Sequence, residues 1–192
     1  YEIMPSLVGS EMCIRDSSRI GQCSQIGPNA TICNSTIGPH SQVNGAVVED
    51  STLENDVSVG LSSHIRSGSH LKAFVRVGNS VEVKSSELGQ GTKCGHFSYI
   101  GDSEIGSDVN VGAGTVPCNY DGKEKHKTVI RDGAFIGSGS MLVAPVVIRR
   151  MATTGAGSVV VKDVPEKTLV YGVPAAIHKE KLTNSPDGDH NA

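Results

Sequence analysis

Tryptophan is absent from this 192-residue chain, aromatic residues make up only 4%, and leucine occurs only 8 times. Helical bundles depend on leucine and avoid glycine, so the 23 glycines argue against an all-α fold. The few aromatic side chains could not fill the core of an aromatic-rich β-sandwich. Valine is as frequent as glycine, with 23 residues, and this pairing favours many short strands joined by tight turns.

The chain also has no basic excess, because its net charge is −3. Binding along a phosphate backbone needs such an excess, so we expect no nucleic-acid partner. No run of about 18 apolar residues occurs, so we expect no membrane span. The five cysteines form no CxxC pair, which favours free thiols and a cytoplasmic location.

Three segments are expected from the pattern of the chain. Residues 1–17 share nothing with the rest of the sequence, and we set them apart as a non-native or artefactual tail. Residues 18–165 carry a continuous repeat and are expected to form one domain. Residues 166–192 are expected to be a C-terminal extension that is partly disordered, because its last stretch is polar. The chain opens in the middle of a pattern, which indicates a piece of a longer protein.

A six-residue repeat dominates the central segment. Apolar residues recur six apart in runs of five and six members, and glycine follows many of them. The spacing between successive apolar positions shortens by one residue at 32–37, 83–88 and 100–105. The two longest runs are Val59, Ile65, Leu71, Val77, Val83 and Ile130, Ile136, Leu142, Ile148, Thr154, Val160.

A period of six fits neither a helix nor the alternation of a sandwich strand. It predicts an all-β fold, a single-stranded parallel β-helix of hexapeptide repeats in which each hexad is one flat face. One apolar side chain per face would point inward, and the glycine beside it would let the backbone turn the corner. Three faces, and so three hexads, would make one coil, and the segment would hold about eight coils.

The repeat breaks between Val111 and Ile130, where the sequence reads PCNYDGKEKHKTV. Such an excursion from a solenoid is usually functional or a partner contact.

Several motifs in the chain resemble one family. They read HIRSG, GHFSYIGDSEIG, VNVGAGTVPCNYDGKEKHKT and FIGSGSMLVAPV, and the similarity covers most of residues 20–165. They are similar to the C-terminal acetyltransferase domain of the bifunctional UDP-N-acetylglucosamine pyrophosphorylase/glucosamine-1-phosphate N-acetyltransferase. The resemblance implies a left-handed β-helix, transfer of acetyl from acetyl-CoA to the amine of glucosamine 1-phosphate, and a homotrimer with sites between subunits. The pyrophosphorylase activity would lie outside this chain.

Arg66 and Lys84 are three hexads apart with no slip between them, so we expect them to stack one rung apart. Two cations at that spacing suit a phosphate, although exposed surface charges are an alternative reading. Acyl transfer to an ammonium group also needs a base, and the imidazole of His96 suits that role near neutral pH. The resemblance places both cations at substrate-binding positions and His96 at the catalytic position.

Further roles come from the resemblance alone. Tyr99, Asn110 and Lys125 match sugar-binding positions, with Lys125 reaching across the trimer. Ser138 and Ala156 are likewise three hexads apart, and small side chains in one column would leave a groove for the pantetheine arm. The positions that match acetyl-CoA contacts are Ala113, Asn119, Tyr120, Ser138 and Ala156.

One segment departs from the family. Many members carry an arginine that meets the CoA phosphates near residue 172, and this chain reads LVYGVP there. Arg149, Arg150 and Lys162 are candidates for that role. His64 and His70 lie one hexad apart without an evident third ligand, so we expect no metal.

Two alternatives stay open on the residues. The first is an acyltransferase for another amino sugar or nucleotide sugar. The second is a non-catalytic β-helix that serves as the trimerisation or regulatory module of a nucleotidyltransferase. A third, a metal hydratase of the γ-carbonic-anhydrase type, is disfavoured because it needs three metal-binding histidines across an interface, and the sequence shows no such set.

Overall fold

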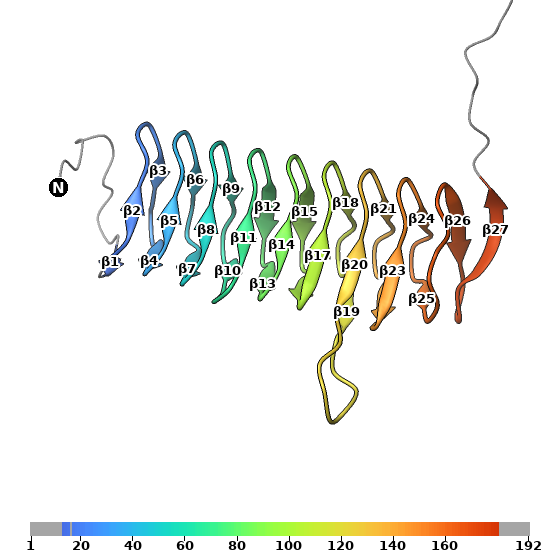
Figure 1. Ribbon diagram of the computed structural model, residues 1–192. Helices are drawn as coiled ribbons and strands as arrows, with labels where there is room; N and C mark the ends of the chain where they lie inside the picture. The colour runs from blue at the N-terminus through green and yellow to red at the C-terminus, as the bar shows by residue number, and fades with distance from the viewer. Residues whose placement is uncertain (1–12, 16, 181–192) are drawn as a thin grey trace, which may run out of the picture.

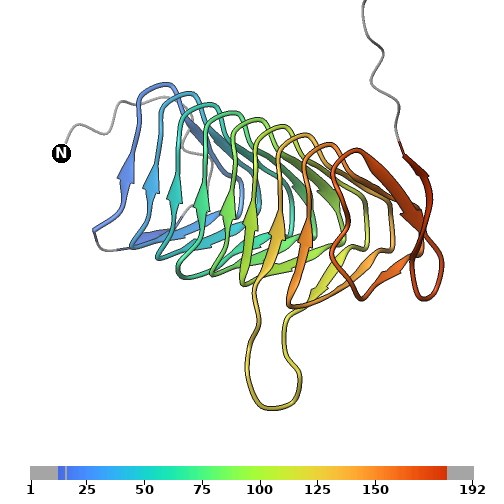
Figure 2. The same ribbon diagram turned by 45° about the vertical axis from the view of Figure 1, so that its right-hand side comes forward.

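The computed structural model describes residues 13–15 and 17–180, and these form one solenoid of short strands without a helix. Successive strands turn through three flat faces, so that every third strand pairs in parallel with the one a coil earlier (Figures 1 and 2). The expected left-handed parallel β-helix is thereby confirmed. The described part of the chain has no helix long and apolar enough to cross a membrane.

We name the faces A, B and C in the order in which the chain visits them. Face A consists of β1 (Cys13–Arg15), β4 (Thr31–Cys33), β7 (Val47–Glu49), β10 (His64–Ile65), β13 (Glu82–Lys84) and β16 (Tyr99–Gly101), continued by β19 (Val116–Cys118), β22 (Met141–Val143) and β25 (Val159–Val160). Face B consists of β2 (Arg19–Ile20), β5 (Thr36–Ile37), β8 (Thr52–Leu53), β11 (His70–Leu71), β14 (Glu87–Leu88), β17 (Ser103–Ile105), β20 (Thr128–Ile130) and β23 (Val146–Ile148).

Face C carries the longest ladder. It consists of β3 (Gln25–Ile26), β6 (Gln42–Val43), β9 (Ser58–Val59), β12 (Arg76–Asn79), β15 (Lys93–His96), β18 (Asn110–Val111), β21 (Phe135–Ile136), β24 (Thr153–Thr154), β26 (Thr168–Tyr171) and β27 (Ala176–Glu180). The parallel ladder therefore runs past residue 165 into β26, and β27 then closes it in antiparallel pairing. At the other end of the solenoid, β1 lies inside the segment 1–17 and pairs with β4. The origin of that segment stays a prediction.

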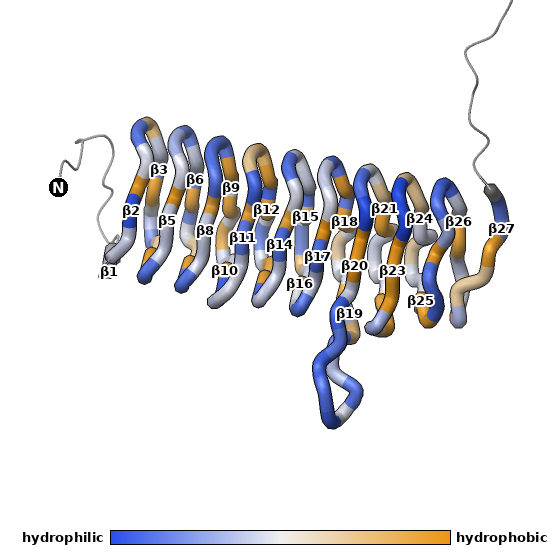
Figure 3. Tube along the Cα trace, viewed as in Figure 1, coloured by the Kyte–Doolittle hydropathy of each residue, from blue (hydrophilic) through white to orange (hydrophobic). Residues whose placement is uncertain are grey.

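The core is a column of mostly branched side chains, one from nearly every strand. Ile32, Ile65 and Leu88 are among those with no exposed surface. Figure 3 shows apolar residues recurring on every coil among hydrophilic ones. Thr154, which falls on the six-residue beat, is also buried, and its hydroxyl accepts a hydrogen bond from Gly137 N at 3.0 Å.

The corners correct one prediction. Glycines such as Gly60, Gly78 and Gly112, which follow an inward side chain, do not adopt the left-handed conformation that a corner needs. The left-handed corner residues are instead glycines at other positions, such as Gly68 and Gly91, and residues that include asparagine, aspartate and serine. A methyl group on Gly60, Gly78 or Gly112 would collide with the backbone of the next coil. They are glycine because the coils approach closely there.

The excursion after β19 is a loop of residues 119–127, which projects from the solenoid before β20 (Figure 1). This loop lengthens its coil. Paired positions on either side of it, such as Ser103 and Thr128, are farther apart in the sequence than paired positions in the coils near the N-terminus, which are separated by three hexads or slightly less. Figure 3 shows this loop as mostly hydrophilic.

Candidate active site

Arg66 and Lys84 stand on successive rungs at one edge of face A, because β10 and β13 pair in a register that matches Ile65 with Val83. The next rung in that column is Gly101, and its missing side chain leaves room that the phenol of Tyr99 fills. The side chains of Arg66, Lys84 and Tyr99 are all half-buried. Face A therefore presents two cations and a phenol within three rungs.

The two cations differ in whether an acidic side chain forms an ion pair with them. The guanidinium of Arg66 binds the Glu82 carboxylate at 2.6 Å, and this hydrogen bond raises the pKa of Arg66. Over the residues that the structure describes, Lys84 has no ion-pair partner. The position equivalent to Glu82 one rung later is Tyr99, so the acid that would match Lys84 is missing. An anion such as a phosphate group would supply the balance.

The corner between faces C and A aligns His96 with three predicted acetyl-CoA contacts. The carbonyl of His96 accepts a hydrogen bond from Gly114 N at 3.2 Å, which places Ala113 on the next rung. The carbonyls of Ala113 and Ser138 continue the ladder, so Ala156 follows in the same column. The prediction that Ser138 and Ala156 stack is met by the register of β21 and β24.

A second column without side chains runs beside this one. On each rung the residue that precedes the corner is glycine: Gly95, Gly112, Gly137 and Gly155. We call these glycines, together with Ala113, Ser138 and Ala156, the small-residue strip. It begins at His96 and runs toward the C-terminal end of the solenoid, and a slender ligand could lie along it.

Phe97 is a feature that the sequence analysis missed. It is 71% exposed, adopts a left-handed φ of 47°, and its ring centroid lies 6.2 Å from that of His96. A left-handed conformation is costly for a bulky residue. The signal in the sequence is a large residue at a corner where the neighbouring coils have the small residues Ser62, Ser80, Gly114, Gly139 and Gly157.

The loop lies at the edge between faces A and B, the edge that carries Arg66 and Lys84, and it gathers two predicted residues around an aspartate that was not predicted. The amide of Asn119 donates to Asp102 Oδ2 at 2.5 Å, and Lys125 Nζ lies 3.9 Å from the same oxygen. Asn119 is buried, whereas the side chain of Lys125 is 51% exposed. Asp102 therefore holds the base of the loop and positions both residues.

The tip of the loop is held by Asp121. Its carboxylate accepts backbone N–H groups of Glu124 at 2.8 Å and Lys123 at 2.7 Å, and it contacts His126 Nε2 at 2.7 Å. These bonds, led by the one from Glu124, lower the pKa of Asp121. Tyr120, which bridges to Lys125 across the loop, is 60% exposed. It does not lie in the column of the other predicted acetyl-CoA contacts.

Asn110 lies on another side of the molecule. It begins β18 on face C, between Lys93 and Phe135 on the neighbouring rungs. A single chain therefore brings Arg66, Lys84 and Tyr99 together on face A, and His96 and Lys125 to its two borders. It does not bring Asn110 onto that face.

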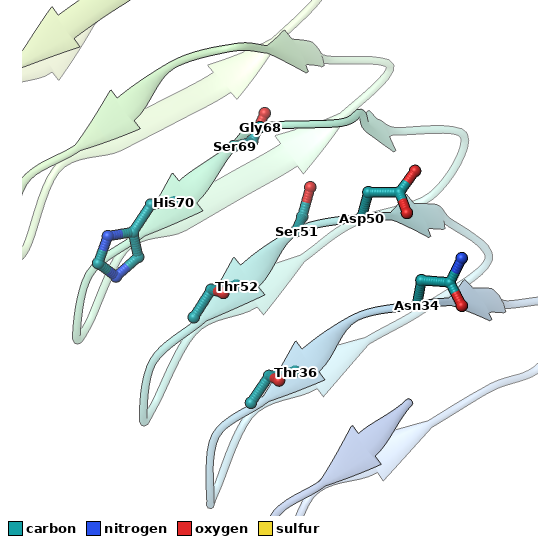
Figure 4. A pocket seen from close by; sticks show the side chains of 8 residues that line it. All are labelled: Asn34, Thr36, Asp50, Ser51, Thr52, Gly68, Ser69 and His70. Atoms are coloured by element: carbon teal, nitrogen blue, oxygen red, sulfur yellow. The ribbon is translucent and has the colours of Figure 1, made fainter. Parts of the chain in front are cut away.

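A shallow hollow lies closer to the N-terminus, at the corner between faces A and B and along face B (Figure 4). Its lining is polar and holds none of the predicted site residues: Asn34, Thr36, Asp50, Ser51, Thr52, Gly68, Ser69 and His70. We give this concavity less weight than the face A cluster, because none of its lining residues is a lysine or an arginine that could bind a phosphate. In the ranges 13–15 and 17–180, no group of three or more His, Cys, Asp or Glu side chains could hold a metal ion.

Comparisons with known proteins place the chain in a family. It is 48% identical over 167 residues to the bifunctional protein GlmU of Thermotoga maritima, covering 87% of this chain and 38% of that protein. It is 46% identical to GlmU of Heliobacterium modesticaldum, covering 85% of this chain and 36% of the relative. The chain thus spans less than two-fifths of the length of these relatives. No family model matches it.

The solved structures agree on the fold. The UDP-N-acetylglucosamine O-acyltransferase LpxA of Moraxella catarrhalis superposes with a TM-score of 0.50 at 18% identity, covering 88% of this chain and 73% of that one. At this identity the likeness supports the β-helix alone. The identity to the curated relatives carries the family assignment: the chain belongs to the bifunctional GlmU family and corresponds to a little over a third of a member.

Proposed function

We propose that this chain transfers the acetyl group of acetyl-CoA to the amine of glucosamine 1-phosphate. The observation that carries the proposal is the position of His96. It stands at the junction between the small-residue strip, which suits a slender thioester, and face A, which offers cations to a phosphate. Family membership and the motif resemblance support an acyltransferase, and the charge on face A favours a phosphorylated amino sugar.

The sugar phosphate would bind with its phosphate at Arg66 and Lys84 and its ring near Tyr99. Lys84 has no ion-pair partner among the described side chains, so a phosphate there would complete the charge balance. The amine would then point toward the corner that holds His96.

The proton balance assigns His96 its role. An ammonium group has no lone pair, so it must lose a proton before its nitrogen can attack the thioester carbon. His96 would accept that first proton and pass it to solvent, and the nitrogen would give up a second proton as the new C–N bond forms and the C–S bond breaks. The leaving CoA thiolate would then take up a proton. A backbone N–H at the strip would stabilise the negative charge on the carbonyl oxygen.

We also propose a homotrimer with sites shared between subunits, because one chain leaves Asn110 on face C. A neighbouring copy could present its Asn110 to face A of the first. Lys125, half exposed on a projecting loop, could reach a neighbour in the same way.

The decisive assay measures release of CoA thiol with glucosamine 1-phosphate, glucosamine or UDP-glucosamine as the acceptor. We expect transfer to glucosamine 1-phosphate and a much lower kcat/KM for glucosamine. Preference for UDP-glucosamine would favour the alternative of a nucleotide-sugar acyltransferase. No transfer to any acceptor, with the chain folded as a trimer, would favour a non-catalytic module.

Two variants test the roles of the residues. His96→Ala should lower kcat by about 10²–10⁴-fold, and near-normal turnover would contradict the role of base. Arg66→Ala should mainly raise KM for the sugar phosphate. Arg19→Ala, which changes an exposed arginine on face B near the N-terminal end of the solenoid, is the matched control and should change neither constant.

Shared sites predict complementation between two inactive variants. His96→Ala and Asn110→Ala chains, refolded together, should regain activity, because mixed trimers would contain sites with both native residues. Random mixing would restore about a quarter of the sites. If each site used residues of one chain only, the mixture would stay as inactive as its parts.

A further inference from the structure

An aromatic pair stands at the C-terminal end of the small-residue strip. Tyr171, the last residue of β26, stacks on His178 of β27 with ring centroids 3.4 Å apart and an angle of 12° between the planes. The register of the two strands shifts between Leu169 and Val170, which leaves His178 without a paired residue. This irregularity turns the imidazole against the phenol ring.

The pair continues the glycine column of face C. The pairing of Thr154 with Val170 places Gly155 beside Tyr171. A methyl group at Gly155 would lie 2.6 Å from Tyr171 Cβ, so the glycine keeps the approach to the ring clear. Tyr171 is therefore the first large side chain along the strip after His96.

The separation fits a long, slender ligand. Four steps from one rung to the next lead from the corner of His96 to that of Tyr171, by way of Ala113, Ser138 and Ala156. Each rung advances about 4.8 Å, which gives roughly 19 Å along the axis. A chain of about five or six extended residues has this reach, and the pantetheine diphosphate arm of CoA, built from amide units, is of similar length.

The pair also has the surface character of a binding platform. Tyr171 is 45% exposed and points outward, whereas the inward side chain of this coil is Val170. The apolar side chain of Val173, two residues after Tyr171, is 73% exposed. A planar heteroaromatic base can stack on such a surface without specific hydrogen bonds.

We propose that the Tyr171–His178 pair binds the adenine base of acetyl-CoA and thereby fixes the end of the ligand that is far from His96. This inference rests on the proposed function. It gives the segment without arginine near residue 172 a contact of a different kind, stacking in place of charge.

The test compares two ligands by isothermal titration calorimetry. CoA carries the adenosine portion and 4′-phosphopantetheine does not. Tyr171→Ala should weaken CoA binding about tenfold, the range seen when a base loses a stacking partner, and should leave phosphopantetheine binding unchanged. Tyr171→Phe should bind CoA like the wild type. Equal weakening for both ligands, or none for CoA, would overturn the proposal.

A matched control separates this effect from damage to the hairpin. Ile177→Ala removes an exposed side chain from the same strand without touching the ring pair, and it should leave CoA affinity unchanged. A tenfold loss with Ile177→Ala would assign the effect to the hairpin and refute the stacking. Wild-type binding of CoA tests the proposed function separately: if the wild type binds CoA and Tyr171→Ala binds it equally well, only this inference fails.

Discussion

Two glycines on successive rungs of face C predict opposite outcomes for the same substitution. A methyl group on Gly78 would run into the carbonyl oxygen of Gly95, far inside van der Waals contact. A methyl group on Gly95 would find no heavy atom within 4 Å. Neither glycine has a left-handed φ, so alanine suits both backbones equally well. Gly78→Ala and Gly95→Ala are therefore a matched pair that differs only in the space available.

The cost of Gly78→Ala depends on which atoms must move. The obstructing atom belongs to the backbone, so the clash is relieved only if two coils separate. Overpacking typically costs about 1–3 kcal/mol, and the stretched ladder bonds, such as Phe97 N to Asn79 O at 3.2 Å, add about 1 kcal/mol each. We expect a loss of roughly 3–5 kcal/mol for Gly78→Ala. Gly95→Ala should be neutral or stabilise by up to about 1 kcal/mol, because alanine restricts the unfolded chain.

Urea unfolding followed by far-UV circular dichroism measures the difference. Both variants and the wild type must be compared at one protein concentration, because association would add to apparent stability. In a thermal scan the Gly78→Ala midpoint should fall by about 10 °C. Equal losses in both variants would show that glycine is needed for its conformation rather than for the approach of the coils, and would refute the reasoning.

Four further predictions concern single residues. Ser86→Ala should cost about 1–3 kcal/mol in urea unfolding, because its buried hydroxyl accepts Ser103 N–H at 2.9 Å; exposed Thr52→Ala should cost far less. Burial raises the pKa of Cys94 to about 11, so iodoacetamide at pH 8.5 should spare it and modify exposed Cys23. Since the unfolded thiol ionises near pH 8.5, folding stability should fall as pH rises from there toward 11, and Cys94→Ala should reduce that slope; burial also raises the pKa of Cys118, which would supply the remainder. The hydrogen bonds from Glu124, His126 and Lys123 lower the pKa of Asp121, so loop order should be complete above about pH 4 and decline below it. Trypsin should cut Asp121→Ala faster at Lys123, while Asp108→Ala should resemble the wild type. Phe97→Gly should gain about 1 kcal/mol by removing a strained corner, and a loss of stability would show that the ring packs for folding.

The strands were predictable because the core demands one branched side chain for every face. The sequence shows this as the beat from Val59 to Val83, and those residues are buried as expected. The six-residue spacing is shortened by one residue on reaching Val48 and again on reaching Leu53, and these two slips were not predicted. There Ala46, Val47 and Val48 are consecutive apolar residues, so the sequence alone does not show which one points inward. Only the packed coil makes that choice, and it buries Val48 completely.

The candidate site was predictable only where its residues share a regular register. Arg66 and Lys84 could be paired from their spacing. The contact of Asp102 with Asn119 could not, because it depends on where a projecting loop leaves and re-enters the solenoid. The stack of Tyr171 on His178 was likewise hidden, because it needs an antiparallel strand and a register shift that no repeat announces.

Three departures from the repeat border face A on neighbouring coils, and each one has a cost in stability. A coil built for stability alone would place a small residue at the corner, an acid opposite each cation and a tight turn after each strand. This protein places strained Phe97 beside His96, leaves Lys84 without an acid among the described residues, and extends the loop 119–127 next to Asp102. Local rules of this kind are broken chiefly at functional sites. Because the three costs border the same face, one ligand could offset all of them, and an anionic sugar placed between the loop and His96 would do so.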